Sequence, residues 1–224
     1  MAGTLYIVAT PIGNLEDITL RAIRILKEVD LIACEDTRQT RKLLTSLSIS
    51  NHVTSYFDHN RLTKGDVILR ELDSGKNVAL VSDAGTPGIS DPGYPLIVSA
   101  IEKGISIIPI PGPSAVIAAL SAAGLPTDQF HFVGFLPLKK GKTRRWIESL
   151  KDEEATLVFY ESPFRVKKTL PLLLEIFGNR KAVLVHELTK IHEEFKRGTL
   201  EELILKQNEI VEKGEWIILV AGRE

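Results

Sequence analysis

Short apolar runs alternate with helix-like segments through the first half of the chain, and this alternation limits the possible folds more than any other feature. Strands are expected at the apolar runs, at 5–9, 31–34, 53–57, 77–82 and 106–110. Helices are expected between them, at 19–29, 40–47, 64–74 and 95–103, with Gly75 ending the third. Such alternation is typical of a parallel sheet. The first half is therefore predicted to form an α/β domain.

A second, shorter series of the same kind fills the rest of the chain. Strands are expected at 130–135, 156–160, 182–187 and 216–221. Helices are expected at 114–123, 144–150, 164–177 and 199–207. We place the boundary so that the two α/β domains are 1–115 and 116–224. No linker composition marks this boundary, so the two halves are expected to pack closely.

Composition narrows the class of protein. Of the 224 residues, 44% are hydrophobic and 25% are charged, as expected of a soluble globular protein. The net charge is −1, so a nucleic-acid partner would need a local basic patch. One cysteine, Cys34, excludes an internal disulfide and fits a reducing compartment. With no membrane-length apolar run and no signal-peptide pattern, a cytoplasmic protein without membrane contact is expected.

The loop at 82–94 is the strongest candidate for a binding site. It follows a predicted strand and precedes a predicted helix, and its thirteen residues include three glycines, two prolines and the carboxylates Asp83 and Asp91. Most strand-to-helix connections are much shorter. Small side chains leave backbone groups accessible to a ligand. We therefore expect a ligand at this strand end.

Two further loops, at 9–14 and 109–115, also follow predicted strands. In a parallel sheet all three loops would lie at the same edge. Ser114 is placed to cap the next helix, and the amides after it would attract an anion. Alone, the Pro-Gly-Pro of the third loop could simply shape a turn. Together, the three loops favour a common site.

A dinucleotide-binding unit is the competing interpretation of the first half. Glu35 and Asp36 follow the second strand at about the spacing of a ribose-binding acid. However, the first loop has one glycine where that fingerprint needs three, and Pro11 removes an amide. A nicotinamide cofactor is therefore not expected. Glu35 and Asp36, with Arg38 and Arg41, either face a ligand or form a solvated helix start.

Cations concentrate in the second half. Five of them, Lys139, Lys140, Lys142, Arg144 and Arg145, fall within seven residues. They suit a phosphate-binding patch, although a solubilising loop is the plainer explanation. Tyr160 and Arg165 could contact a base and a phosphate, or be a buried tyrosine and a surface arginine.

The sequence gives little support for a metal site or for a catalytic nucleophile. His186 falls on a predicted strand and His192 in a loop, without zinc-type spacing, so no metal site is expected. His52, His59 and His131 are treated as surface or packing residues. Cys34 is expected to pack as a small apolar side chain.

At five segments the chain resembles a known family. The segments at 5–15, 35–38, 82–94, 111–115 and 187–190 are similar to those of the bacterial 16S ribosomal RNA (cytidine-2′-O)-methyltransferases, within the tetrapyrrole methylase superfamily. The resemblance covers nearly the whole chain in order. It implies two α/β domains with S-adenosylmethionine in the cleft between them, and a homodimer. Many members continue past the position corresponding to Glu224, and any RNA contacts made by that extension are expected to have no counterpart here.

The resemblance also implies roles for particular residues. The methionine end of the cofactor is expected against Asp83, Ala84, Gly85 and Ile89, with Ser114 and Ala115 beside it and Pro11 and Gly13 lining the floor. The adenosine end is expected at Tyr160, Leu188, Thr189 and Ala221. The general base is expected among Asp91, Asp36 and Glu35, in that order. RNA phosphates are expected at Arg38, Arg41, Lys139, Lys140, Arg144, Arg145 and Arg165.

The function implied is methylation of a cytidine 2′-hydroxyl in the 16S RNA of the small ribosomal subunit. Two alternatives remain at this point. A tetrapyrrole C-methyltransferase of the same fold would need a large apolar floor and little basic surface. A non-catalytic RNA-binding assembly protein would bind RNA without transferring methyl groups.

Overall fold

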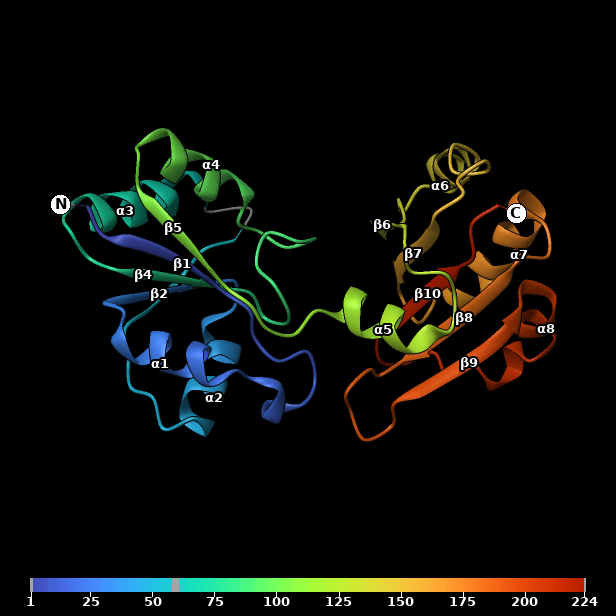
Figure 1. The fold of residues 1–224 in the computed structure, drawn as a ribbon, viewed down its shortest axis with the longest axis horizontal. Coiled ribbons are helices and arrows are strands. Elements are labelled where there is room, and N and C mark those ends of the chain that lie inside the picture. Colours follow the sequence, from blue (N-terminus) through green and yellow to red (C-terminus); the bar gives the residue numbers. More distant parts are fainter. Residues whose placement is uncertain (1, 58–60, 224) are drawn as a thin grey trace. The chain divides into compact units, whose positions relative to one another are not determined.

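The computed structural model describes residues 2–57 and 61–223. The chain divides into two compact units, Met1–Ser114 and Ala115–Glu224. Each unit is built on its own five-stranded sheet (Figure 1). In the part of the chain that is described, no helix has the length and apolar character needed to cross a membrane.

The first unit is an α/β layer structure with a parallel sheet. Its strands are β1 (Thr4–Val8), β2 (Leu31–Cys34), β3 (Val53–Ser55), β4 (Val78–Val81) and β5 (Ser106–Ile110). They lie in the order β3-β2-β4-β1-β5, and every neighbouring pair is parallel. The predicted parallel sheet is confirmed.

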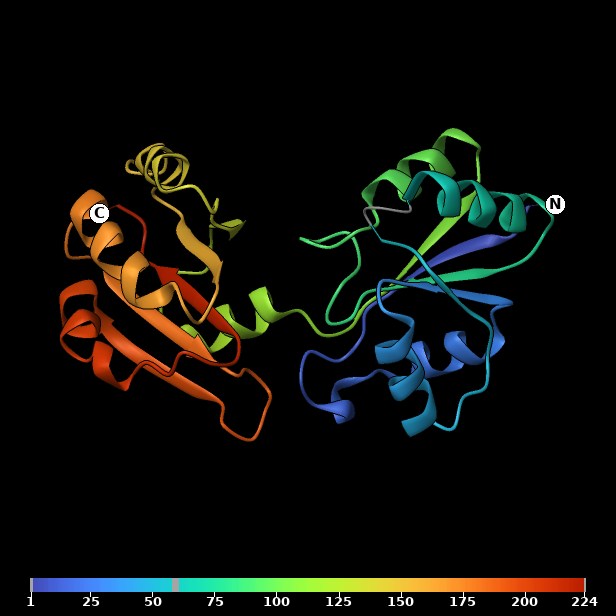
Figure 2. The ribbon, with the colours of Figure 1, turned by 180° about the vertical axis from the view of Figure 1, so that it is seen from behind.

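Helices cover both faces of this sheet (Figures 1 and 2). The helices are α1 (Leu20–Glu28), α2 (Thr37–Ser46), α3 (Arg61–Asp73) and α4 (Tyr94–Glu102), with a short 3-10 turn at Leu15–Asp17. One apolar cluster joins α1 and α2 to the sheet, and another joins α3 and α4 to it. Gly75 ends α3 as expected: its φ is +94°, and its N–H donates to Leu72 O at 3.0 Å.

The second unit has a mixed sheet. Its strands are β6 (Phe130–Phe135), β7 (Thr156–Glu161), β8 (Lys181–His186), β9 (Glu194–Thr199) and β10 (Trp216–Val220), in the order β6-β7-β10-β8-β9. Only β6 and β7 are parallel, and the other three pairs are antiparallel. Strand β9 was not predicted, because its sequence has no apolar run.

Four helices and a short turn complete the second unit. They are α5 (Ala115–Ala123), α6 (Lys140–Glu148), α7 (Val166–Phe177) and α8 (Leu200–Leu205), with a 3-10 turn at Gln207–Glu209. Helix α5 packs in one apolar cluster on the sheet, and α6, α7 and α8 share another. Helix α6 begins four residues earlier than predicted, so most of the cationic run is helical rather than a loop.

Candidate functional site

The three proline- and glycine-containing loops of the first unit meet at the carboxyl edge of its sheet. Thr10 and Gly85 exchange two backbone hydrogen bonds of 2.9 and 3.0 Å. Thr10 Oγ1 donates to Ser82 O at 3.1 Å, and Thr86 Oγ1 donates to Pro113 O at 3.4 Å. The loops that follow β1, β4 and β5 are thus held together, as the parallel sheet predicted.

Gly85 is where this junction is tightest. Its φ is +81°, a conformation that residues with a side chain rarely adopt. A Cβ placed there would lie 3.5 Å from the Ile12 side chain and 4.0 Å from Pro113 O. Glycine therefore lets the 82–94 loop turn back against the other two loops.

The residues predicted to hold the methionine end of the cofactor in this unit differ in exposure. Asp83, Ala84, Ile89 and Gly13 are exposed, Pro11 and Ser114 are half-buried, and Gly85 is buried. Ala115, half-buried, begins α5. Asp83 Oδ1 accepts a hydrogen bond from the Asp36 N–H at 3.1 Å, which joins the loop after β4 to the loop after β2. An exposed carboxylate beside small residues is suited to bind an ammonium group.

A pocket of about 440 Å³ opens at the same edge. It is lined by Glu35, Asp36, Thr37, Arg38, Ser55, Phe57 and Asp83. Sequence reasoning had singled out four of these residues and missed Thr37, Ser55 and Phe57. Their position at the carboxyl ends of two predicted strands was the signal that could have found them.

Asp36 is fixed in this pocket by its own helix. It caps α2, accepting from the Arg38 N–H at 2.8 Å, and its carboxylate also accepts hydrogen bonds from the Arg38 guanidinium. These bonds lower the pKa of Asp36 to about 2. A carboxylate that is so strongly stabilised in its charged form is a weak proton acceptor.

Asp91 has the opposite electrostatics. It is half-buried in the loop after β4, and burial raises the pKa of its carboxyl, with a further upward contribution from the charge of Asp83. Hydrogen bonding from Ser82 opposes the shift only in part. Among the acids whose pKa is shifted here, Asp91 is better suited than Asp36 to accept a proton near neutral pH.

The second unit carries a strained loop directly after β8. Glu187 and Thr189 have φ values of +48° and +66°, although neither is glycine. Lys190 Nζ holds the loop in place through Glu187 and Glu215, at 3.0 and 2.8 Å. Within residues 2–57 and 61–223, the buried hydroxyl of Thr189 has no hydrogen-bond partner. Strain beside an unsatisfied buried hydroxyl is typical of a ligand-binding loop.

The sheet register brings three of the four predicted adenosine residues to one end of the second sheet. Leu188 and Thr189 follow His186, which pairs with Trp216, and Tyr160 pairs with the next residue, Ile217. Tyr160 is half-buried, with its ring edge-on to Phe132 and Phe135.

Ala221, the fourth predicted adenosine residue, lies apart from the other three in the second sheet. It follows the far end of β10, four residues and about 13 Å beyond the partner of Tyr160 at the usual rise of a strand. Its backbone bonds to Lys181 and Arg180 there. The sequence placed Ala221 in the last strand, one residue beyond its observed end, and gave no register.

Four of the predicted RNA contacts have partners within their own unit. Arg38 pairs with Asp36, and Arg145 Nε donates to Gly141 O at 3.2 Å. Arg144 pairs with Glu148 and Glu175. Arg165 is half-buried and donates to Leu136 O and Pro137 O, both at 3.0 Å. The Arg144 and Arg165 guanidinium groups are thus committed within the unit, which argues against their role as RNA contacts. Arg38, Arg41, Lys139, Lys140 and Arg145 are exposed.

The remaining histidines and the cysteine have ordinary environments. His131 contacts Glu153 at 3.1 Å, His52 is exposed, and His59 lies outside the described residues. His186 stacks on Trp216. Cys34 is fully buried in β2, as expected, and burial raises the pKa of its thiol. Among the described side chains, no group of three or more histidines, cysteines and acids is arranged to hold a metal.

Comparison with known proteins identifies the family. The model of the Tetrapyrrole (Corrin/Porphyrin) Methylases matches residues 4–204. The chain belongs to the tetrapyrrole methylase family. Methylases of this family use S-adenosylmethionine, and this chain is a methyltransferase that depends on it.

The similarity to curated relatives covers nearly the whole chain. Ribosomal RNA small subunit methyltransferase I of Halalkalibacterium halodurans is 56% identical over 98% of this chain and 76% of its own length. The proteins of the same name from Synechocystis sp. and Bacillus subtilis are 50% and 47% identical, again over 98% of this chain and over 79% and 75% of their own lengths.

Solved tetrapyrrole methylases share the fold. A cobalt precorrin-4 methyltransferase has a TM-score of 0.69 and 21% identity, covering 97% of this chain and 94% of its own. The uroporphyrin-III-C-methyltransferase of Thermus thermophilus has a TM-score of 0.68 and 20% identity, covering 98% and 94%. The predicted tetrapyrrole methylase fold is therefore confirmed.

Proposed function

We propose that this methyltransferase acts on the 2′-hydroxyl of a cytidine in the 16S RNA of the small ribosomal subunit. One observation carries the proposal: 56% identity over 98% of the chain to a protein named as a small-subunit ribosomal RNA methyltransferase. The solved corrin and porphyrin methylases are 20–21% identical, a level that supports a common fold and not a common substrate.

The residues present fit S-adenosylmethionine. In the first unit, exposed Asp83 would bind the ammonium group, and Ala84 and Gly85 would offer backbone groups beside it. In the second unit, Tyr160, Leu188 and Thr189 would bind the adenosine. The Thr189 hydroxyl, which has no partner among the described residues, supports this assignment. When bound, S-adenosylmethionine supplies a methyl group already activated by its bond to a sulfonium sulfur.

The protein's part of the chemistry is positioning and proton removal. Holding the ribose oxygen in line with the methyl carbon lowers the barrier, because the reacting atoms no longer have to find each other. Transfer of the methyl group from sulfur to the ribose oxygen would leave a neutral thioether, and the hydroxyl proton would pass to a base of the protein. We assign this role to the Asp91 carboxylate, because the pKa of Asp91 is raised and that of Asp36 is lowered.

The pocket at the end of β2 and β3 is proposed to receive the target nucleoside. Glu35, Asp36 and Asp83 outnumber Arg38 there, so the pocket repels a phosphate and suits a sugar or base. Carboxylate oxygens can accept hydrogen bonds from ribose hydroxyls, and Phe57 offers a ring for stacking. The exposed cations Arg38, Arg41, Lys139, Lys140 and Arg145 would then contact the RNA backbone.

Methyl transfer to defined substrates tests the function. The protein is incubated with labelled S-adenosylmethionine and either small ribosomal subunits lacking the modification or a porphyrin precursor. Label on a ribose oxygen is the expected result. Label on the precursor would identify a tetrapyrrole C-methyltransferase, and RNA binding without transfer to either substrate would identify an assembly protein.

Two broader expectations accompany the proposal. The enzyme would act in the cytoplasm, where small subunits are assembled, and it would form a homodimer as the family resemblance implies. Sedimentation equilibrium at micromolar concentration measures the dimer directly, and a monomer mass would contradict it.

A further inference from the structure

A second pocket, of about 680 Å³, lies entirely within the second unit. Its lining includes the start of β8 at Lys181 and the residues after β10, Ala221 to Arg223. The register places it at the opposite end of the sheet from His186 and Trp216, which precede and face the strained 187–190 loop. The pocket is therefore separate from the residues assigned to the cofactor in this unit.

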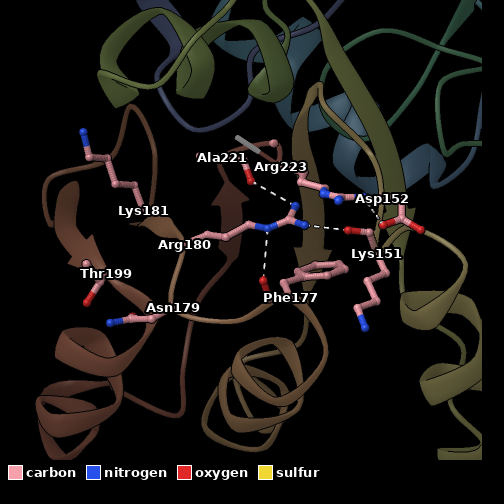
Figure 3. Close-up of a pocket in the computed structure, with 10 residues that line it drawn as sticks. Lys151, Asp152, Phe177, Asn179, Arg180, Lys181, Thr199, Ala221 and Arg223 are labelled. Atoms are coloured by element: carbon pink, nitrogen blue, oxygen red, sulfur yellow. Dashed lines mark hydrogen bonds and ion pairs between the residues drawn. The ribbon is translucent and has the colours of Figure 1, made fainter.

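Arg180 forms the rigid centre of this pocket (Figure 3). Its Nε donates to Phe177 O at 3.2 Å, and its Nη2 donates to Lys151 O at 2.5 Å. Longer bonds, of 3.4 and 3.5 Å, reach Ala221 O and Glu153 O. The guanidinium also lies 4.9 Å from the centre of the Phe177 ring. Arg180 thus places a positive charge where three chain segments meet, at 151–153, 177–180 and 221.

The groups around Arg180 add to this charge. Lys151 and Lys181 are exposed on either side of it (Figure 3), and in the described part of the chain neither ammonium group has an ion-pair partner. Arg223 pairs with Asp152, the only carboxylate among the described lining residues, at 2.7 Å. Burial, together with the charge of Arg223, lowers the pKa of Arg180. Four cations and one carboxylate give the pocket a net charge of about +3 at neutral pH.

We propose that this pocket binds a phosphodiester of the substrate RNA, at a point distant along the RNA from the methylated nucleotide. The proposal rests on the proposed function, because it requires a polyanionic substrate. A pocket with two lysines at its rim that have no described ion-pair partner suits such a substrate. The chain as a whole has a net charge of −1, so this local excess of cations is not a property of the entire surface. Lysine ammonium groups on long, exposed side chains suit the binding of backbone phosphates, because this binding depends on charge and requires little geometric precision.

The salt dependence of RNA binding tests the pocket. The double variant K151A/K181A removes the two free cations and leaves Arg180 and its carbonyl bonds in place. A matched control, K27A/K206A, removes two exposed lysines outside the pocket. Affinity for 16S RNA fragments is measured over a series of salt concentrations, and circular dichroism checks that each variant is folded. The pocket variant is expected to reduce the slope of log K against log salt by about 1.4, at about 0.7 for each lost phosphate contact.

A variant expected to have the opposite effect on RNA binding provides a second test. D152N removes the pocket's carboxylate and frees Arg223, so it should tighten RNA binding and steepen the salt slope. Equal slopes for wild type and K151A/K181A, or an equal loss in K27A/K206A, would overturn the proposal. One further result would overturn it: inorganic phosphate raises the melting temperature of the wild type, but K151A/K181A binds RNA as tightly as the wild type does. The pocket would then bind small anions and not RNA.

The methyl-transfer assay separates this proposal from the function on which it rests. If wild type methylates small subunits and the slopes are equal, only the pocket proposal fails. If wild type transfers no label to RNA, the proposed function fails whatever the slopes show.

Discussion

At the scale of single residues, Asp83 and Thr189 carry the most information about the site. Asp83 is an exposed carboxylate in the loop after β4, held by a hydrogen bond from the Asp36 amide. Thr189 has a positive φ and a buried hydroxyl without a partner among the described residues. The Asp83 carboxylate offers a negative charge, and the Thr189 hydroxyl offers a hydrogen bond that no described residue uses. Both features are typical of ligand-binding positions.

We expect Asp83→Ala to weaken S-adenosylmethionine binding by about ten- to a hundredfold, because a hydrogen bond to a charged group contributes about 1.5–3 kcal/mol. Isothermal titration calorimetry measures the affinity. Asp66→Ala, at an exposed aspartate of α3, is the control and should bind as wild type does. Unchanged affinity in Asp83→Ala would remove this residue from the site.

Thr189→Val should separate stability from binding. Valine keeps the shape of threonine and removes the unpartnered hydroxyl, so the protein without ligand should gain about 1 kcal/mol in free energy of unfolding. S-adenosylmethionine should bind more weakly because its partner group is lost. Denaturant unfolding and calorimetry measure the two quantities. A variant that binds the cofactor as wild type does would contradict the assignment.

The proton-accepting role of Asp91 predicts both a rate loss and a pH profile. Asp91→Asn should lower kcat by about 10²- to 10⁴-fold with little change in cofactor affinity. Burial raises the pKa of Asp91 above its ordinary value of 3.8, so the acid limb of the wild-type rate profile should lie above that pH. The raised pKa favours the neutral carboxyl in the folded state. Its contribution to stability is therefore complete below the ordinary pKa and lost as the pH rises through the raised one.

Asp128→Asn, at an exposed position in the second unit, is the control. Its kcat, its affinity for S-adenosylmethionine and its pH–rate profile are measured in the same way. An acid limb that persists unchanged in Asp91→Asn would assign the proton to another group.

Much of the residue-level picture was accessible from the sequence. The loop with Asp83 and Asp91 stands out by composition, and both residues lie where the strand pattern placed them. The structural roles of Arg144 and Arg165 could not be read in this way. Arg165 donates to carbonyls 28 and 29 positions away in the chain, and Arg144 pairs with Glu175, 31 positions away. Such contacts depend on how helices and strands pack.

At the scale of elements, close backbone approach positions the strands of the first sheet. Gly3, just before β1, donates its N–H to Leu72 O at 2.8 Å. A Cβ on Gly3 would lie only 1.9 Å from the carbonyl oxygen of Lys76, before β4. Only a residue without a side chain allows β1 to enter the sheet at this point.

Gly3→Ala is therefore expected to destabilise the first unit by about 3 kcal/mol, since the backbone must shift to relieve the collision. Gly104→Ala is the matched control: its φ is +69°, but a Cβ there meets no atom within 4 Å. It should cost about 1 kcal/mol from backbone strain alone. Urea unfolding followed by circular dichroism compares the two, and equal losses would contradict the close-approach explanation.

Element prediction succeeded where apolar runs marked strands and failed where they did not. Strand β9 is an edge strand, and its residues are exposed or half-buried, so its sequence lacks a hydrophobic signal. The N-terminal turn of α6 was missed because lysines hide the helical pattern. Strand direction in the second unit was not predicted, since β8, β9 and β10 pair antiparallel through contacts that periodicity does not encode.

At the scale of the whole molecule, the apolar core is divided. Two of the four buried clusters lie wholly within residues 1–114, and the other two lie wholly within residues 115–224. Because none of the clusters formed by the described residues draws on both units, each unit has the means to fold by itself.

We expect fragments 1–114 and 115–224, expressed separately, each to unfold cooperatively in urea. Circular dichroism and tryptophan fluorescence follow the transitions, the latter only in the second fragment, which contains Trp146 and Trp216. The intact chain serves as the reference. A fragment with no sigmoidal transition would show that its core depends on the other unit.

The burial of Cys34 has a practical consequence for studying local opening of the first unit. It is the chain's single cysteine, and its side chain is fully enclosed in β2. A thiol reagent can reach the sulfur only when the surrounding core opens, so the labelling rate measures that opening as hydrogen exchange does for amides. The natural sequence thus contains a site-specific reporter for the first unit that is blind to the second, with no engineered label required.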